Sequence, residues 1–326
     1  MKVLFAMGNT SPYFRQRIAE LEQRFPGVAF VLAKDQEARR KELPTAQVLV
    51  AGGLSEEELA GADNLQVVFV PFTGVNRFPL EQLENRGIAL CNSHAKARFI
   101  AERAFALALA VMGRVVEMHN LMKDRGVWLT RQKWGKEYWS TLFGKKCAIY
   151  GLGSIGEQLI PLLRAFDCQI LALERDRGKG LADAYASGLA ELAATADVLF
   201  VCVPLTSKTA GSIDGRVLSK MQDNYLVNIA RGEVVEEEAL YNALKEGVLA
   251  GAGLDVWYQY PRPPYEHPVR GSRYPFWECP NVVMSPHAAA HAREDNNAYY
   301  QDMFNQLEHF LEHKQPLKAV KIVNRL

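Results

Sequence analysis

The chain has 326 residues, enough for two domains of ordinary size, and its composition of 48% hydrophobic and 23% charged residues is typical of a globular protein. A formal net charge of +1 gives no electrostatic reason to expect nucleic acid or an anionic membrane as a partner, and no apolar run is long enough to span a bilayer. The five cysteines are odd in number and scattered through apolar runs, which predicts reduced, buried thiols in a cytoplasmic protein.

The N-terminal part alternates strand and helix patterns. Short apolar runs predict buried strands at 2–8, 28–33, 46–53, 65–71 and 88–93. Between the first two strands, a predicted helix places Ile18, Leu21 and Phe25 at helical spacing. Because alternating strands and helices pack as a parallel sheet with helices on both faces, this part predicts an α/β domain.

A long helical pattern follows at 99–126. Its first half is apolar and its second half polar, so we expect the first half to be buried and the second to lie closer to solvent. The next segment, 126–140, mixes tryptophans with basic residues. Since the net charge is near zero, this mixture favours an interface or a domain-packing arm over a nucleic-acid surface.

A second alternating series occupies the rest of the chain. Strands are predicted at 146–150, 168–174, 197–205, 225–232, 251–257 and 281–287, and a last helical pattern covers 296–313. The whole chain therefore predicts an α/β protein with two doubly wound parallel-sheet domains.

A glycine-rich loop follows the strand at 146–150 and opens a helix. Gly151 permits a tight turn, Gly153 lets the backbone approach a pyrophosphate, and Gly156 lets helix and strand pack closely. The N–H groups at the start of the helix, around Ser154 and Ile155, then face the phosphate charge. Such glycines also occur in loops where they serve only the turn, but the strand–loop–helix setting favours dinucleotide binding.

The carboxylate expected for NAD is also present. Glu174 ends the next strand, 18 residues after Gly156, at the distance where an acid accepts hydrogen bonds from the adenosine ribose. A carboxylate there repels a 2′-phosphate, so NAD is favoured over NADP. Arg175 and Arg177 leave NADP open, because arginines accommodate that phosphate.

Four more strand ends in this series carry polar residues, as expected of a ligand crevice. The segments 142–156, 202–214, 227–257 and 281–287, in this order, closely resemble the D-isomer-specific 2-hydroxyacid dehydrogenases, and 73–93 and 101–111 look like the family's first domain and connecting helix. The resemblance implies a flavodoxin-like substrate-binding domain, 1–97 plus 293–326, and a Rossmann NAD-binding domain, 98–292. It also implies a homodimer formed largely through the NAD-binding domain.

The resemblance implies roles for individual residues. Arg231 matches the arginine that binds the substrate carboxylate and polarises its carbonyl, and His287 matches the general acid–base. A structural ion pair or a structural histidine is the alternative for each. Thr73 and Gly74 match the loop whose backbone N–H groups face the substrate carboxylate, and Asp255 matches the residue that holds the nicotinamide carboxamide. Further cofactor contacts are expected from Val203, Pro204, Thr209, Ile229 and Ala230.

Two histidine pairs, His287 with His291 and His309 with His313, have the i, i+4 spacing of metal ligands. Neither pair has a third ligand at supporting spacing, and the first lacks the glutamate of a zinc protease motif. We therefore expect no metal.

The sequence departs from the family at the partner of His287. The family places a glutamate before the proline that follows the Asp–Val step, where it stabilises imidazolium and raises its pKa. Here Tyr260 occupies that position and Gln259 precedes it. Either residue can orient the imidazole, or Glu266 or Glu278 can fold back from the loop. We expect direct orientation by Tyr260 or Gln259, which leaves His287 less basic than a glutamate-paired histidine.

The chain is thus expected to be an NAD-dependent oxidoreductase that converts a small 2-oxo acid to the D-2-hydroxy acid, or the reverse, by hydride transfer. Two alternatives remain. The aromatic, proline-rich segment after Asp255 resembles formate dehydrogenases, although their glutamine is out of register here. The missing glutamate also keeps open an NAD-sensing regulatory protein with little or no activity.

Overall fold

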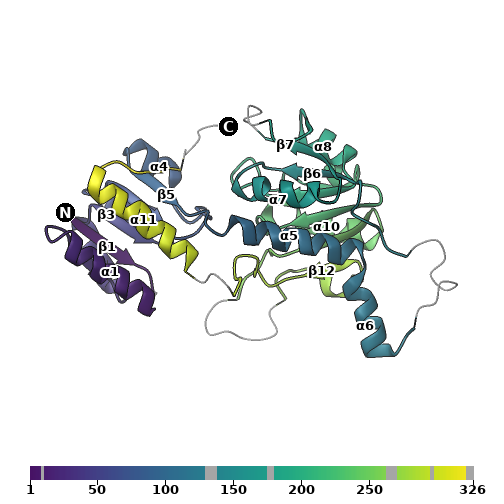
Figure 1. The fold of residues 1–326 in the computed structure, drawn as a ribbon, viewed down its shortest axis with the longest axis horizontal. Helices are drawn as coiled ribbons and strands as arrows, with labels where there is room; N and C mark the ends of the chain where they lie inside the picture. The colour runs from purple at the N-terminus through teal and green to yellow at the C-terminus, as the bar shows by residue number, and fades with distance from the viewer. Residues whose placement is uncertain (9–10, 129–137, 175–179, 262–269, 294–296, 321–326) are drawn as a thin grey trace. The chain divides into compact units, whose positions relative to one another are not determined.

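The computed structural model describes residues 1–8, 11–128, 138–174, 180–261, 270–293 and 297–320. The chain divides into two compact units: unit 1 comprises 1–96 and 293–326, and unit 2 comprises 97–292 (Figure 1). Each unit is built around one parallel sheet. The prediction of two doubly wound parallel-sheet domains is confirmed.

Unit 1 contains a five-stranded sheet in the order β2-β1-β3-β4-β5. Its strands are β1 (Lys2–Ala6), β2 (Ala29–Leu32), β3 (Val48–Ala51), β4 (Val67–Val70) and β5 (Ala89–Asn92). Its helices are α1 (Pro12–Arg24), α2 (Gln36–Glu42), η1 (Leu43–Thr45), α3 (Glu56–Ala60), α4 (Leu80–Asn85) and α11 (Ala298–His313). The strand order reverses direction at β1, so the flavodoxin-like expectation holds.

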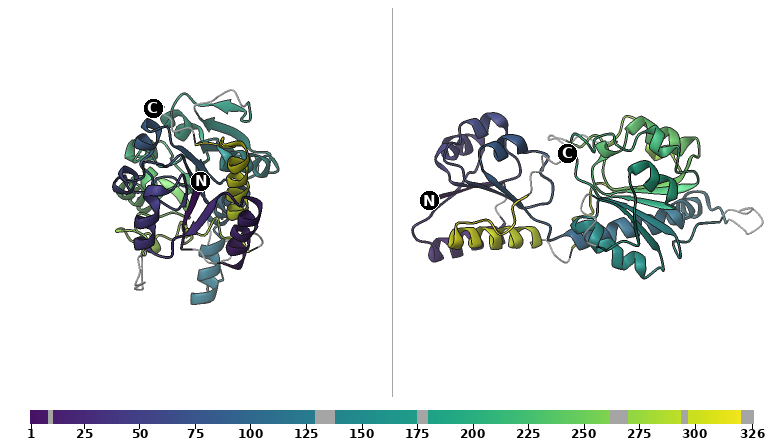
Figure 2. Two further views of the ribbon diagram at one scale, coloured as in Figure 1. Left: turned by 90° about the vertical axis from the view of Figure 1, so that its left-hand side faces the viewer. Right: turned by 90° about the horizontal axis from the view of Figure 1, so that it is seen from above.

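Alternate residues of these strands enter two separate cores, as a period of two requires. Val3, Phe5 and Val50 pack on α1 and α11, whereas Leu4, Leu49 and Val68 pack on the other side with α3 and α4. The right-hand view of Figure 2 shows α11 and α1 together on one face of the sheet. The C-terminal helix thus completes the core of the N-terminal domain.

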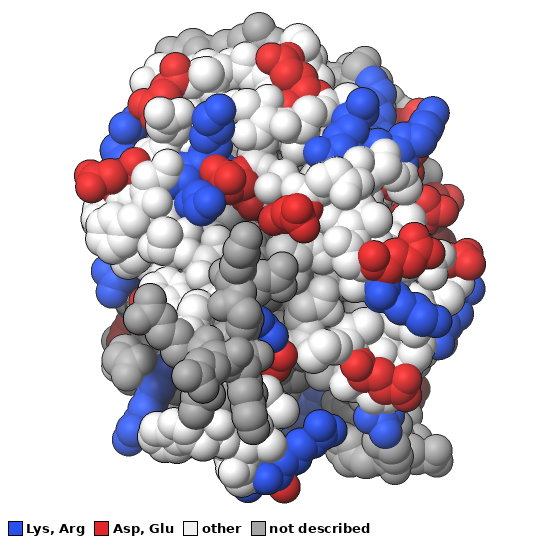
Figure 3. Space-filling model, turned by 90° about the vertical axis from the view of Figure 1, so that its right-hand side faces the viewer, with Lys and Arg blue, Asp and Glu red and all other residues white. Residues whose placement is uncertain are grey.

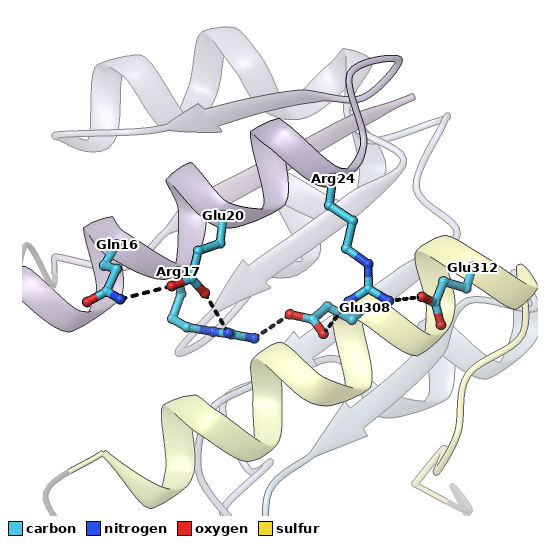
Figure 4. Close-up of polar contacts among 6 residues, drawn as sticks. All are labelled: Gln16, Arg17, Glu20, Arg24, Glu308 and Glu312. Carbon is cyan, nitrogen blue, oxygen red and sulfur yellow. Dashed lines mark hydrogen bonds and ion pairs between the residues drawn. The ribbon is translucent and has the colours of Figure 1, made fainter.

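A network of ion pairs joins α1 to α11 (Figure 4). Glu308 of α11 binds both Arg17 and Arg24 of α1, and Arg24 also pairs with Glu312. The side chains of Arg17 and Glu308 are only 21% and 20% exposed, whereas that of Glu312 is 37% exposed. Loss of the Glu308 carboxylate would therefore leave the partly buried guanidinium of Arg17 without its partner on α11.

We expect Glu308→Ala to destabilise the protein by about 1 kcal/mol, more than Glu312→Ala, because a partly buried ion pair is screened less than an exposed one. Urea unfolding monitored by circular dichroism will measure both variants. Equal losses for the two, or a larger loss for Glu312→Ala, would show that the partial burial of Glu308 adds nothing.

Unit 2 contains a seven-stranded sheet in the order β12-β11-β10-β9-β6-β7-β8. Its strands are β6 (Lys146–Tyr150), β7 (Gln169–Leu173), β8 (Ala184–Tyr185), β9 (Val198–Val201), β10 (Asn224–Asn228), β11 (Leu249–Leu254) and β12 (Val282–Met284). Its helices are α5 (Ala97–Met112), α6 (Val115–Arg125), α7 (Ser154–Arg164), α8 (Leu189–Thr195), α9 (Gly215–Leu218), η3 (Gly232–Val234), α10 (Glu237–Lys245) and η4 (Phe276–Glu278). The order reverses between β6 and β9, which places a ligand crevice at their carboxyl ends.

The predicted helix at 99–126 is two helices, so the expectation of one continuous helix was wrong. α5 ends at Met112, and Arg114 adopts a left-handed conformation with φ of 49° before α6 begins. The burial prediction is confirmed: eight residues of α5 are buried and none of α6 is. The two-residue strand β8 escaped prediction because it is too short to form an apolar run.

The surface agrees with the near-zero net charge. On the face drawn in Figure 3, lysine and arginine side chains are interspersed with aspartate and glutamate, so the described residues there create no field of one sign. Within the described parts of the chain, no helix combines the length and the hydropathy that a membrane crossing requires. Of the five free cysteines, Cys91, Cys147 and Cys168 are buried as expected, whereas Cys202 and Cys279 are only partly buried.

Candidate functional site

The glycine loop between β6 and α7 has the geometry of a phosphate-binding turn. Gly151 has φ of +96°, and a Cβ there would lie 2.7 Å from the Val203 side chain. A Cβ on Gly156 would lie 2.7 Å from the carbonyl oxygen of Gly151, so the helix packs directly on the turn. Gly153 differs: it caps the helix without a side-chain hydrogen bond, and a Cβ there would meet no atom within 4 Å. The loop therefore presents open space at the N-terminus of α7.

The loop that follows β9, residues 202–209, is stabilised by hydrogen bonds of its own side chains. The hydroxyl of Thr209 donates to the carbonyl oxygen of Pro204 at 2.6 Å and accepts from the backbone N–H of Thr206 at 2.8 Å. Val203 is buried against Gly151. Thr209 thus shapes the loop that faces the glycine turn. Glu174 directly follows β7, and Arg175 lies outside the described residues.

Arg231 is positioned by a buried asparagine that the sequence analysis did not single out. Asn228, 1% exposed at the end of β10, donates to the carbonyl oxygen of Arg231 at 2.9 Å and accepts from the N–H of Ala230 at 3.1 Å. This closes a turn that contains Ile229, Ala230 and Arg231. The guanidinium donates one hydrogen bond, from Nη1 to the carbonyl oxygen of Ala230 at 2.7 Å. The other N–H groups of the Arg231 guanidinium form no hydrogen bond with the described residues and can donate to a ligand.

The next residue, Gly232, brings this turn against the end of β11. A Cβ on Gly232 would lie 2.5 Å from the backbone carbonyl of Trp257, so only glycine permits the approach. The backbone N–H of Asp255 also donates to the carbonyl oxygen of Asn228 at 3.1 Å. Residues that follow β10 and residues that follow β11 are therefore packed together at one edge of the sheet.

Asp255 holds the turn that carries His287. Its side chain, in a residue 1% exposed, accepts from the N–H groups of Ala288 and Ala289 at 3.0 Å each and from the hydroxyl of Ser285. His287 lies at the centre of this turn in a left-handed conformation, with φ of 56°. Such a conformation costs about 1–2 kcal/mol for a residue with a side chain, so the surrounding hydrogen bonds maintain it.

Among the described residues, the imidazole of His287 contacts the ring of Tyr260 and no carboxylate. The two ring centroids are 5.3 Å apart with an interplanar angle of 52°. The Tyr260 hydroxyl accepts from the N–H of Trp257 at 3.1 Å, which fixes the phenol. Of the alternatives, Gln259 and Glu278 are exposed, and Glu266 lies outside the described residues. Among the residues that the structure describes, the His287 side chain has no hydrogen-bonded partner.

This environment makes His287 a weaker base. Although the residue as a whole is exposed, the atoms packed around its ring lower the pKa of His287 by desolvation, and the charge of Arg231 lowers it further. Asp255 acts in the opposite direction but does not prevail. The expectation that His287 is less basic than a glutamate-paired histidine agrees with this direction. Arg231 is also close enough for its charge to act on the imidazole.

The predicted substrate residues of the first domain lie in unit 1. Thr73 donates to the carbonyl oxygen of Ser93 at 2.9 Å, and its own carbonyl oxygen accepts from the side-chain amide of Asn92 at 2.7 Å. These bonds hold the loop that includes Gly74. A crevice of about 800 Å³ lies in the same unit where the strand order reverses, with walls that include Gly8, Gly52, Gly53, Phe72 and Arg77.

The two histidine pairs do not form metal sites in the described residues. No group of three histidine, cysteine, aspartate or glutamate side chains in that part of the chain is arranged to hold a metal ion. The rings of His309 and His313, one turn apart on α11, have centroids 4.4 Å apart and are tilted by 47°.

Known proteins resemble this chain over most of its length. Residues 105–289 match the family model described as D-isomer specific 2-hydroxyacid dehydrogenase, NAD binding domain. The chain is 30% identical over 308 residues to glyoxylate/hydroxypyruvate reductase A of Arabidopsis thaliana, covering 92% of this chain and 94% of that protein. The chain belongs to the D-isomer specific 2-hydroxyacid dehydrogenase family.

A second relative of this chain is longer. D-3-phosphoglycerate dehydrogenase of Archaeoglobus fulgidus is 30% identical over 302 residues, which cover 90% of this chain and 54% of that protein, so the chain spans about half its length. The fold is shared with the NADPH-dependent glyoxylate/hydroxypyruvate reductase of Sinorhizobium meliloti, solved with NADP and malonate, at a TM-score of 0.79 and 24% identity over 98% of this chain and 97% of that one.

The resemblance expected from the sequence is confirmed, and with it an NAD(P)-dependent oxidoreductase family. The glycine loop fits a dinucleotide, because no atom of the described residues lies within 4 Å of a Cβ built on Gly153 and the adjacent helix start has no side-chain cap. Gly151, Gly153 and the N–H groups of Ser154 and Ile155 would hold the pyrophosphate.

The two glycines should respond differently to substitution. Gly153 has φ of −84°, which any residue adopts, so Gly153→Val should fold normally and weaken NADH binding by about tenfold or more. Gly156→Ala should lower the unfolding temperature, because its Cβ would clash with the backbone at 2.7 Å. NADH fluorescence titration and thermal unfolding will measure the two effects. Unchanged NADH affinity in Gly153→Val would contradict the prediction that this loop binds the pyrophosphate.

Proposed function

We propose that this family member reduces a small 2-oxo acid to the D-2-hydroxy acid with a nicotinamide cofactor, and catalyses the reverse reaction. The observation that carries the proposal is the pairing of two independently held groups at one sheet edge: Arg231, fixed by Asn228, and His287, fixed by Asp255. A permanent cation and a titratable imidazole near each other are what reduction of a carbonyl beside a carboxylate requires.

In this mechanism Arg231 binds the substrate carboxylate with its remaining donors and polarises the adjacent carbonyl. Thr73 and Gly74, in unit 1, are proposed as substrate-binding residues through their backbone N–H groups. His287 donates its proton to the carbonyl oxygen as a hydride reaches the carbonyl carbon, so the oxo acid gains two electrons and two hydrogens. The nicotinamide, when bound, supplies that hydride. In the reverse direction neutral His287 takes the hydroxyl proton.

We also propose that the cofactor site prefers NAD to NADP. Glu174, at the end of β7, supports NAD through hydrogen bonds to the ribose hydroxyls. Asp255, whose carboxylate already holds the His287 turn, is proposed to contact the carboxamide of the nicotinamide as well, since each carboxylate oxygen accepts more than one hydrogen bond. Val203, Pro204, Thr209, Ile229 and Ala230 are proposed to line the rest of the cofactor site.

The test is a substrate screen. Glyoxylate, hydroxypyruvate, pyruvate and bulkier 2-oxo acids are each tested with NADH and with NADPH. Formate is tested with the two oxidised cofactors. We expect oxidation of NADH by at least one 2-oxo acid. Tight NADH binding without turnover of any acid would favour the second candidate, a cofactor-sensing protein; in its support, no carboxylate of the described residues is bonded to His287. Turnover of formate alone would favour a formate-dehydrogenase-like enzyme.

The pH dependence follows from the lowered pKa of His287. Reduction uses the protonated imidazole, so kcat/KM for the 2-oxo acid at saturating NADH should fall as pH rises through a value below that of an ordinary histidine, about 6.5. Oxidation uses the neutral imidazole and should persist to lower pH. A reduction profile that stays flat well above the ordinary histidine pKa would indicate a carboxylate partner after all.

A homodimer is proposed from the surface of unit 2. α6 has no buried residue, yet Val115, Val116 and Met122 are 57%, 39% and 53% exposed, and the flanking Trp128 and Trp139 are 72% and 60% exposed. A run of exposed apolar side chains of this kind marks an association surface. The central part of the predicted arm lies outside the described residues. Light scattering should give the mass of a dimer.

A further inference from the structure

The segment after β11 forms a strap, residues 257–261 and 270–274, that lies beside His287. The N–H groups of Tyr258 and Gln259 both donate to the carbonyl oxygen of Gly271, at 3.0 and 2.9 Å, so the two ends of the strap are tied together. Gly271 has φ of +71°, and a Cβ there would lie 3.0 Å from the Trp257 ring. Tyr260, at the end of the first part, contacts the imidazole of His287.

A buried glutamate anchors this strap. Glu237, the first residue of α10 and 6% exposed, accepts from the hydroxyl of Ser272 at 2.9 Å and from the backbone N–H of Arg273 at 2.9 Å. It also accepts from Nε of Arg273 at 2.8 Å. These bonds lower the pKa of Glu237 in spite of its burial, so the carboxylate is charged at neutral pH. A buried acid with this many partners has a defined structural task.

The contacts form one continuous path from the anchor to the proposed general acid. Glu237 holds Ser272 and Arg273, whose neighbour Gly271 holds Tyr258 and Gln259. A second anchor lies just before α10, where the Tyr258 hydroxyl donates to the carbonyl oxygen of Val235 at 3.0 Å. Two residues further along, the ring of Tyr260 contacts that of His287, with centroids 5.3 Å apart.

We propose that Glu237 is a positioning residue for the reaction: through the strap it holds Tyr260 against His287. The inference rests on the proposed function. Glu237 would thus act on His287 indirectly, by fixing the position of the strap, and not through a hydrogen bond to the imidazole. Glu237 touches neither substrate nor cofactor in this account.

The test compares Glu237→Gln with Glu236→Gln. Glu236 precedes it, is exposed, and its side chain makes no cap hydrogen bond, so the control removes the same charge without touching the strap. In Glu237→Gln the strap should loosen and draw the Tyr260 ring away from the imidazole, which removes part of the desolvation that lowers the pKa of His287 and leaves the charges of Arg231, Asp255 and His291 in place. Nuclear magnetic resonance titration of His287 should show its pKa rising toward an ordinary value, with no change in Glu236→Gln.

The kinetic expectation is a fall in kcat of about tenfold for oxo-acid reduction in Glu237→Gln, with the KM for NADH unchanged. Tyr260→Ala should shift the His287 titration in the same direction, and the double variant should add nothing further, as expected for residues acting through one path. Arg273→Lys serves as a milder variant if Glu237→Gln does not fold.

A His287 titration unaltered by Glu237→Gln, or additive shifts in the double variant, would overturn the proposal. The titration does not depend on turnover. If no 2-oxo acid is reduced, the proposed function fails while the link between Glu237 and His287 is still measured.

Discussion

Arg231→Ala should lower kcat/KM for reduction of the 2-oxo acid by about a thousandfold, the loss typical of a donor that stabilises charge in the transition state. The residue is proposed to bind the substrate carboxylate and to polarise the carbonyl, and it lies three residues after the end of β10. Steady-state kinetics across a range of oxo-acid concentrations will measure the loss.

Two controls separate this effect from a structural one. The Arg231 guanidinium bonds only its neighbouring backbone carbonyl among the hydrogen bonds of the described residues, so Arg231→Ala should change the unfolding temperature little. Arg231→Lys keeps the charge but loses the forked donors, and should recover only a small part of the activity. Full activity in the lysine variant would mean that charge alone suffices and that the carboxylate is bound elsewhere.

His287→Asn should lower kcat in both directions by about 10²- to 10⁴-fold, the contribution expected of a general acid–base. Asparagine is the appropriate replacement because His287 has φ of 56°, and asparagine tolerates the left-handed region better than most residues. The Asp255 hydrogen bonds to the flanking backbone should then persist, so the turn keeps its shape.

The matched control is His291→Asn, a histidine in the same turn region that no step of the mechanism uses. We expect near-normal kcat there, and normal NADH affinity in both variants. The pH dependence assigned to His287 should vanish only in His287→Asn. A pH limb that survives this substitution would place the general acid on another residue.

The position that holds a glutamate in the family holds Tyr260 here, and this difference affects the pKa of His287. A glutamate bonded to the imidazole would orient it and raise its pKa together. Here Tyr260 contacts the ring without supplying charge, and the pKa of His287 is lowered. In the proposed reaction, a His287 of lowered pKa would stay neutral to lower pH and would therefore accept the hydroxyl proton at lower pH than a glutamate-paired histidine.

Much of the fold was predictable from sequence because it depends on local patterns. The strands around Leu4, Val50 and Val68 are continuous apolar runs, and parallel strands buried on both faces require such runs. The glycine turn was also predictable from a local pattern, since Gly151 has a positive φ and a Cβ on Gly156 would lie 2.7 Å from the carbonyl oxygen of Gly151, so both positions favour glycine. The break between α5 and α6 was missed because the helical pattern continues through Arg114, whose left-handed conformation no pattern signals.

The sequence by itself determined the two-domain α/β fold, the family, and the identity of Arg231 and His287 as the pair to consider. Only the tertiary structure decided how they are held: Asn228 closes the turn at Arg231, Asp255 maintains the left-handed His287, and Tyr260, one of the two residues that the sequence offered, contacts the imidazole. The reason is physical. Strand and turn propensities act between neighbours in the chain, whereas these contacts join residues brought together only when separate strands pair in one sheet.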